Sequence, residues 1–187
     1  MRTFGGKTIV VVDKVYDDEI ELGGNKLWVD RSFANKDWHR KISGVVVSSG
    51  LVPEGSKVYF HYLETNKPQA SPNNYVMDDA RLFCYVDGAG QIQMLNDFVL
   101  IDPIQKESIS TLLYVPDNEK VYNDRGVVAV IGENDIELVP GDKVLLMPNS
   151  NFTNEIEGKE YFVVRHDDII AVFNDTESLD PHDNSHQ

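Results

Sequence analysis

The sequence from Arg125 to Phe173 reads Arg-Gly-Val-Val-Ala-Val-Ile-Gly (125–132), then Leu-Val-Pro-Gly-Asp-Lys-Val-Leu-Leu-Met-Pro-Asn (138–149) and Glu-Tyr-Phe-Val-Val-Arg-His-Asp-Asp-Ile-Ile-Ala-Val-Phe (160–173). Its first apolar run, Val127 to Ile131, is rich in β-branched residues and is apolar at both odd and even positions, which predicts a strand buried on both faces. Pro140-Gly141-Asp142 is a typical turn sequence, because Pro fixes one φ and Gly accepts a positive φ. These signals indicate β structure.

Three further runs continue the pattern. Val144 to Met147 predicts a strand that Pro148-Asn149 ends, and Tyr161 to Val164 and Ile169 to Phe173 predict two more, separated by Arg165 to Asp168. Short strands at close spacing with Gly and Pro between them are typical of a β-barrel or β-sandwich. We therefore predict an all-β fold.

The same order of signals occurs in the first half of the chain. The matched segments are Thr8–Asp13 with Asp97–Asp102, Leu27–Asp30 with Leu113–Pro116, Gly44–Val47 with Gly126–Ala129, and Val52–Val58 with Val139–Val144. A repeat of this length indicates a duplicated domain and not a solenoid. We predict one domain over 1–94, a second over 95–174, a polar loop over Glu64 to Asn74, and a short disordered acidic tail over 175–187.

Composition excludes several classes of function. The 31 acidic residues outnumber the 17 basic ones, giving a formal charge of −14, whereas binding to nucleic-acid phosphates requires a basic face. No apolar run approaches the length of a membrane span, and Met1 to Gly6 leads almost directly into the first predicted strand, without room for a signal peptide. The single Cys84, between Phe83 and Tyr85, is predicted to be a buried thiol. We expect a cytoplasmic protein that binds neither nucleic acid nor membranes.

Candidate catalytic and metal-binding residues do not form working sets. The histidines are His39, His61, His166, His182 and His186, and none stands at ligand spacing with a second ligand on an element predicted to be ordered. The carboxylates at 17–19 and at Asp78-Asp79 could serve acid/base chemistry, although solvated turns are far commoner. Gly88-Ala89-Gly90 lacks the strand-then-helix setting of a dinucleotide loop and is predicted to be a turn. We expect no enzyme activity, no cofactor and no bound metal.

The order of signals from Asp97 to Phe173 closely resembles the co-chaperonin family of the GroES type, and Thr8 to Val86 resembles it more weakly. This resemblance implies two tandem, partly open GroES-like β-barrels with mobile loops. It also implies a homo-oligomer that caps a GroEL-type chaperonin ring and encloses an unfolded client protein, while the partner hydrolyses ATP. The segments Gly132–Leu138 and Ser48–Leu51 are short where many members have a long roof hairpin. Some bacteriophage co-chaperonins are similar in this respect, which raises a bacteriophage origin as a hypothesis; the cytoplasm would then be that of the host.

Two apolar triplets in polar surroundings are the candidate binding residues. They are Leu113-Tyr114-Val115 and Leu27-Trp28-Val29, each between the first and second strands of its repeat. In the family, this position is a mobile loop whose hydrophobic tripeptide docks into the chaperonin ring. The paired glycine that usually precedes the tripeptide is replaced here by Ser110-Thr111 in the second repeat, and Gly23-Gly24 are displaced by two residues in the first. The alternative is that both triplets are edge strands packed on their own barrel.

A second function remains open. A non-enzymatic structural protein, such as a virion or assembly component, could reuse the same barrel and lose the docking loops. An enzyme is a distant third possibility, because the zinc-dependent alcohol dehydrogenases also contain this barrel, but no nucleotide domain or zinc ligand set follows here.

Overall fold

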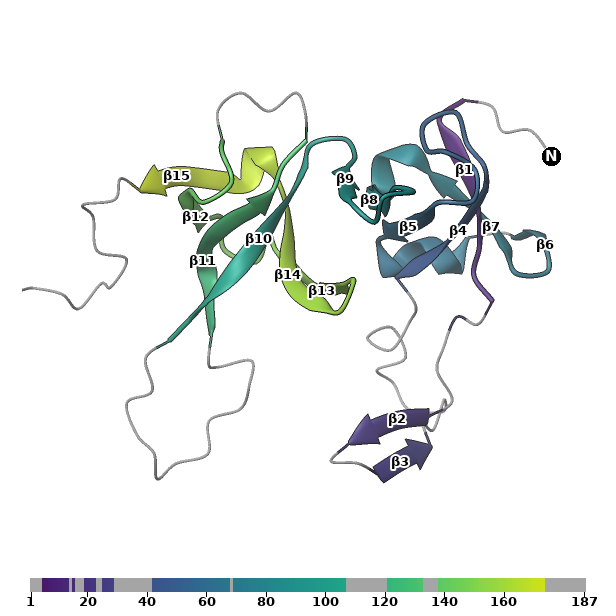
Figure 1. Ribbon diagram of the computed structural model, residues 1–187, viewed down its shortest axis with the longest axis horizontal. Coiled ribbons are helices and arrows are strands. Elements are labelled where there is room, and N and C mark those ends of the chain that lie inside the picture. The colour runs from purple at the N-terminus through teal and green to yellow at the C-terminus, as the bar shows by residue number, and fades with distance from the viewer. Residues whose placement is uncertain are drawn as a thin grey trace, which may run out of the picture. The chain divides into compact units, whose positions relative to one another are not determined.

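The computed structural model describes residues 5–13, 15, 19–22, 25–28, 42–67, 69–106, 121–132 and 138–173. These residues are mostly β-strand, with three short 3-10 turns, which confirms the predicted all-β class (Figure 1). The chain divides into two compact units, Met1–Asn96 and Asp97–Gln187, called here the N-terminal and C-terminal units. Each unit is described by itself.

The N-terminal unit contains a seven-stranded sheet in the order β6-β7-β1-β4-β5-β8-β9, with all its neighbours antiparallel. A separate two-stranded sheet, β2-β3, lies in the connection from β1 to β4. The elements are β1 (Lys7–Val11), β2 (Glu19–Leu22), β3 (Asn25–Trp28), β4 (Ser43–Ser48), β5 (Lys57–Phe60), η2 (Tyr62–Asn66), β6 (Gln69–Ser71), β7 (Asn74–Asp78), η3 (Asp79–Arg81), β8 (Leu82–Val86) and β9 (Ile92–Met94).

The C-terminal unit contains a six-stranded antiparallel sheet in the order β13-β14-β10-β11-β12-β15. Its elements are β10 (Phe98–Gln105), β11 (Val121–Val130), β12 (Lys143–Leu146), β13 (Phe152–Ile156), β14 (Lys159–Arg165), η5 (His166–Asp168) and β15 (Ile169–Phe173). This order reproduces that of the N-terminal unit strand for strand, from β6 and β13 at one edge to β8 and β15 at the other. Within the seven-stranded sheet only β9, which lies outside β8, has no counterpart among the described strands of the C-terminal unit; the β2–β3 hairpin has none there either.

The likeness between the units extends to hydrogen bonds in the turns that precede β5 and β12. In the N-terminal unit the Gly55 N–H donates to the Val46 carbonyl at 2.8 Å, and in the C-terminal unit the Gly141 N–H donates to the Val128 carbonyl at 2.8 Å. Both glycines have positive φ, +84° and +104°, which confirms the turn predicted at Pro140 to Asp142. The β-bulges also recur, between Ile9 and Val10 on β1 and between Leu100 and Ile101 on β10.

One glycine in each unit allows two paired strands to approach closely: Gly44 for β1 and β4, and Gly126 for β10 and β11. A Cβ on Gly44 would meet Val10 Cγ1 at 2.5 Å and would also contact the Val11 carbonyl oxygen. A Cβ on Gly126 would lie 2.6 Å from the Asp102 carbonyl oxygen and against Ile101 Cγ2. Real Cβ atoms do not approach backbone this closely, so both positions require glycine for packing and not for φ.

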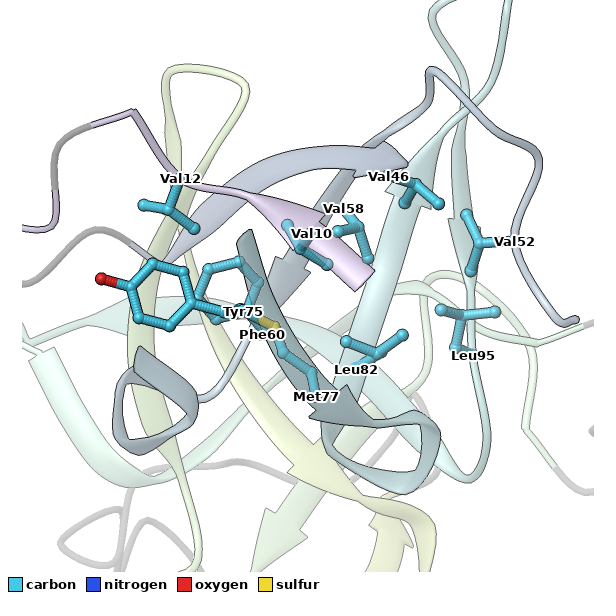
Figure 2. Close-up of a cluster of buried hydrophobic side chains, with 10 residues drawn as sticks. All are labelled: Val10, Val12, Val46, Val52, Val58, Phe60, Tyr75, Met77, Leu82 and Leu95. Atoms are coloured by element: carbon cyan, nitrogen blue, oxygen red, sulfur yellow. The ribbon is translucent and has the colours of Figure 1, made fainter. Parts of the chain in front are cut away.

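Each sheet packs around its own apolar cluster. The N-terminal cluster includes the fully buried Val10, Val58, Phe60, Met77 and Leu82, and Figure 2 shows Leu95 beside Leu82 at its edge. The C-terminal cluster consists of Val99, Ile101, Val128, Leu138, Val144, Leu146, Phe162 and Val164. Burial of apolar area in these clusters is the main favourable term in folding.

The structure corrects three sequence predictions. The strand at Val127 to Ile131 is not buried on both faces: Val128 is 1% exposed, but its neighbours are half-buried. The polar loop predicted at Glu64 to Asn74 is instead the 3-10 turn η2 followed by the β6–β7 hairpin. The repeat match at Val52 is shifted by one residue, because its buried counterpart is Leu138, whereas Val139 is 59% exposed.

Candidate functional site

Side-chain contacts join the ends of β10 and β11 where the connection between these two strands begins and ends. The ring of Tyr122 on β11 contacts two cations, with Lys106 Nζ 5.6 Å and the Arg125 guanidinium carbon 4.8 Å from its centroid. Arg125 also donates from Nε and Nη2 to the Asp124 carboxylate at 2.9 and 3.0 Å, which lowers the pKa of Asp124. The strand ends are therefore held by cation–π and ion-pair contacts.

The predicted docking triplet of the C-terminal unit belongs to this connection. Leu113, Tyr114 and Val115 follow Lys106 and precede Val121 in sequence, and they lie outside the described residues. The structure describes the strand ends on either side of this connection, and the docking role of the triplet stays a prediction.

The equivalent connection of the N-terminal unit joins β1 to β4 and contains the β2–β3 hairpin. In this hairpin Leu27 pairs with Ile20 and Trp28 with Glu19. Its two strands form a sheet of their own and are not paired with the seven-stranded sheet. Val29 lies outside the described residues. The alternative interpretation, in which each triplet is an edge strand of its own main sheet, is therefore wrong for Leu27 and Trp28.

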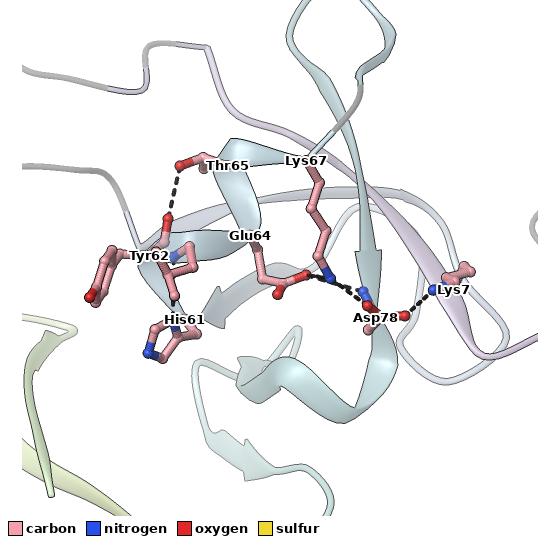
Figure 3. A network of polar contacts seen from close by, with 8 residues as sticks. Lys7, His61, Tyr62, Glu64, Thr65, Lys67 and Asp78 are labelled. Carbon is pink, nitrogen blue, oxygen red and sulfur yellow. Dashed lines mark hydrogen bonds and ion pairs between the residues drawn. The ribbon is translucent and has the colours of Figure 1, made fainter. Parts of the chain in front are cut away.

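A group of charged side chains links η2 to the strands beside it (Figure 3). Lys67 contacts Glu64 Oε2 at 2.7 Å and also pairs with Asp78, which forms a second ion pair with Lys7. Hydrogen bonds from Lys67 and then Lys7 lower the pKa of Asp78 to about 2. The side chain of Glu64 is only 4% exposed and also accepts from the Asp78 N–H at 3.3 Å. These contacts satisfy the carboxylates structurally, and sequence reasoning did not foresee that Glu64 would be buried.

The carboxylate and histidine candidates have structural partners where they are described. Asp79 accepts a 2.7 Å hydrogen bond from Thr8 Oγ1. His61 accepts from the Leu63 N–H at 3.3 Å as the cap of η2, and its pKa is lowered by burial and by the charge of Arg81. His166 lies in η5.

Other candidates fall in turns, in the core or beyond the described residues. His39, His182, His186 and residues 16–18 are not described, and Glu19 is described only as part of β2. Gly88 to Gly90 form the predicted turn, with the Ala89 and Gln91 N–H groups donating to Asp87 Oδ1 at 2.9 Å each. Cys84 is buried, as predicted.

Over the described part of the chain, no group of three or more His, Cys, Asp and Glu side chains could hold a metal ion. Nor does any helix in that part reach the length and apolarity needed to span a bilayer. The features that remain are the two connections at equivalent places in the two sheets.

Among the comparisons with known proteins, the family match falls mainly on the C-terminal unit. The model of the family described as "Chaperonin 10 Kd subunit" matches residues 91–173. The co-chaperonin GroES of Lawsonia intracellularis is 34% identical over 91 residues, which cover 43% of this chain and 90% of the relative. The GroES of Rhodothermus marinus is 32% identical over 44% of this chain and 91% of its own length, and that of Geobacter metallireducens is 27% identical over 44% and 97%.

An all-β unit with a long connection between its first two strands, matched over residues 91–173 by the chaperonin 10 family, defines a co-chaperone domain. The chain belongs to the chaperonin 10 family, whose members similar to it are co-chaperonins of the GroES type. These relatives bear the name of a co-chaperonin and not that of an enzyme. Because under half of this chain covers nearly the whole of each relative, the chain contains a second unit beyond the matched one.

Proposed function

We propose that this protein is a co-chaperonin that caps a GroEL-type chaperonin ring and assists protein folding driven by the partner's ATP hydrolysis. The observation that carries the proposal is the match of nearly the full length of several co-chaperonins to under half of this chain, together with the family match over residues 91–173. In this proposal the protein acts as a homo-oligomer, encloses an unfolded client, and works in the cytoplasm, which is the host cytoplasm if its source is a bacteriophage.

We further propose that the two units are tandem copies of one domain, each curled into a partly open barrel. The shared strand order, the bulges at the same strand pair and the two glycines at the same close approach support this proposal. The weaker likeness of the N-terminal sequence to the family is consistent with divergence after duplication, since the buried positions are kept and the connections differ in length.

The docking residues in this proposal are Leu113, Tyr114 and Val115, with Leu27, Trp28 and Val29 as a second segment. Apolar side chains in a polar connection gain from burial in a partner, and a buried Leu or Val contributes roughly 1.5–3 kcal/mol. Several copies presented by one oligomer bind by avidity, so that each contact can be weak and the whole releasable.

The test is a Leu113→Ser plus Val115→Ser variant of the full chain. We expect it to lose suppression of chaperonin ATPase activity while its thermal unfolding stays that of the parent. The matched control is Val45→Ser plus Val47→Ser, which removes two apolar side chains that are 48% and 37% exposed on β4. We expect this control to keep binding.

Three results would count against the docking assignment or the function. Unchanged ring binding by the Leu113 and Val115 variant refutes the docking residues. A much lower unfolding temperature shows that the triplet is part of the core, as in the alternative interpretation. A parent protein that binds no chaperonin ring favours the structural or virion-assembly role.

A further inference from the structure

The corner that follows β5 differs chemically from its counterpart in the other unit. In the N-terminal unit the corner residue is His61, whose N–H donates to the Arg81 carbonyl at 3.3 Å. In the C-terminal unit it is Met147, which directly follows β12, the counterpart of β5, and whose N–H donates to the Asp168 carbonyl at 2.8 Å. A titratable ring therefore occupies a position that has an uncharged thioether in the C-terminal unit.

Both corners continue into a turn that is closed on the carbonyl of the corner residue. The Glu64 N–H donates to the His61 carbonyl at 2.9 Å, and the Ser150 N–H donates to the Met147 carbonyl at 3.2 Å. In the N-terminal unit the His61 side chain adds a cap, because its Nδ1 accepts from the Leu63 N–H at 3.3 Å at the start of η2. In the C-terminal unit the second contact comes from Ser150 Oγ, which donates to the Met147 carbonyl at 2.7 Å. One corner is thus closed by an imidazole and the other by a hydroxyl group that does not titrate near neutral pH.

The cap on η2 requires a neutral imidazole. A neutral ring has one nitrogen that accepts a hydrogen bond and one that donates, whereas an imidazolium donates from both nitrogens. Because Nδ1 of His61 accepts from the Leu63 N–H, a proton on Nδ1 would set two donors against each other. The first turn of a helix also carries partial positive charge on its free N–H groups, which disfavours a cation at this place. Protonation of His61 therefore opposes the cap in two ways.

Groups from three elements face the ring of His61. It stacks on Tyr62 of η2 with the ring centroids 4.5 Å apart, and it meets Phe83 of β8 edge to face at 6.3 Å. Burial lowers the pKa of His61 first, the charge of Arg81 in η3 lowers it further, and the charge of Glu64 in η2 acts in the opposite direction. The pKa of the ring in the folded chain therefore lies below its ordinary value of 6.5. The surroundings favour the neutral form that the cap requires.

We propose that His61 is an acid-sensitive cap of the N-terminal unit, whose protonation opens the η2 turn while the equivalent corner of the C-terminal unit stays closed. As the pH falls below about 6.5, the unfolded chain binds a proton at this histidine before the folded chain does. The stability that the neutral ring contributes is therefore present above about pH 6.5 and is lost as the pH falls toward the lower pKa of the folded state. One chain thus contains one unit that responds to mild acid at this corner and one that does not.

Opening of η2 affects the buried carboxylate that the turn holds. Glu64 in this turn is 3% exposed, pairs with Lys67 Nζ at 2.7 Å and accepts from the Asp78 N–H at 3.3 Å (Figure 3). Lys67 also closes the end of η2, because its N–H donates to the Glu64 carbonyl at 3.2 Å, and the β6–β7 hairpin follows it. A change at the His61 cap should therefore spread through Glu64 and Lys67 to β6 and β7.

The test is hydrogen exchange of the full chain at about pH 7.5 and about pH 5.5, on either side of the ordinary histidine pKa. Peptides that cover residues 61–67 and 69–78 are followed, after correction for the intrinsic dependence of exchange on pH. Asp78, whose pKa is about 2, stays ionised throughout this interval. The variant His61→Asn keeps a side-chain acceptor for the cap and does not titrate, since Asn is among the preferred N-cap residues. The matched control is His166→Asn, which removes the histidine of η5 in the C-terminal unit.

In the parent we expect protection of both peptides to fall several-fold at the lower pH, while a peptide covering residues 143–156 keeps its protection. His61→Asn should abolish the fall, and His166→Asn should retain it. A second measurement needs no variant: the ring of His61, followed by nuclear magnetic resonance, should titrate below pH 6.5. Constant protection in the parent, a fall that persists in His61→Asn, or a His61 ring that titrates above pH 6.5 would overturn the proposal. These measurements use no chaperonin, so their result is independent of the proposed function.

Discussion

Substitution of Gly126 by Ala should destabilise the C-terminal unit by an amount that the packing determines. The new Cβ would lie 2.6 Å from the Asp102 carbonyl oxygen and would also contact Ile101 Cγ2. Because one of these atoms belongs to the backbone, the strands β10 and β11 must move apart to relieve the contact. Overpacking of this kind costs about 1–3 kcal/mol, and about 2 kcal/mol lowers Tm by roughly 8–16 °C for a domain of this size.

The same substitution at Gly44 should act on the N-terminal unit, because the Cβ there would meet Val10 Cγ1 at 2.5 Å. The matched controls are Gly132→Ala and Gly88→Ala, where a Cβ would meet nothing within 4 Å and φ is not positive. These controls should leave stability nearly unchanged.

The assay is urea unfolding followed by circular dichroism, together with hydrogen exchange of peptides from each unit. Exchange should increase in β10 and β11 for Gly126→Ala and in β1 and β4 for Gly44→Ala, since the clash lies in those strand pairs. The reasoning is refuted if Gly126→Ala unfolds at the same urea concentration as Gly132→Ala. Loss of stability in the wrong unit would refute the equivalence of the two glycines.

Further predictions concern the N-terminal unit. The pKa of Asp78 is lowered to about 2, so its contribution to stability is present above about pH 4 and is lost as the pH falls toward 2; Asp78→Asn should flatten acid unfolding in that interval, measured by circular dichroism. Lys67→Met removes the cation 2.7 Å from the buried Glu64 carboxylate, and unfolding in urea should show a loss of about 1–3 kcal/mol at neutral pH. Leu95→Ala should cost about 2–5 kcal/mol in the same assay, while Leu51→Ala, at a position 46% exposed, should cost much less.

The strands that follow strong local signals could be predicted from the sequence. Ile169 to Phe173 is observed as β15 over the same residues, and Gly141 has the positive φ that its turn requires. In these places β-branched residues and Gly or Pro act locally, so a short window contains the information.

Other elements could not be predicted, because their stability comes from distant partners. β13 reads Phe-Thr-Asn-Glu-Ile and buries only Ile156, so its composition resembles a loop, and its pairing with β14 makes it a strand. The hairpin at 69–78 depends on the left-handed Asn73 and on β1, which pairs with β7. Glu64 is buried because Lys67 and Asp78 lie close by in the fold, a contact that the sequence alone does not reveal.

The sequence predicted where the two connections of the candidate site lie, but it did not predict their structure. The spacing of apolar triplets between first and second strands located both connections, because strand signals flank them on either side. The hairpin around Leu27 was not foreseen, although Gly23-Gly24 between two short runs is a sequence that favours a tight hairpin. In the proposed function the triplets pack against another protein and not against the core of this chain. The sequence therefore contains no pattern that indicates their structure.

The pairing of β9 with β8 covers a sheet edge with a strand from the same chain. Chains of net charge −14 repel one another, so a strand supplied by a separate chain would have to overcome this repulsion, whereas a strand of the same chain does not. At the β8–β9 contact the two partners are connected by the short turn at Asp87 to Gln91, which is closed by hydrogen bonds to the Asp87 carboxylate. A tether of this length raises the effective concentration of the covering strand far above that of a free chain.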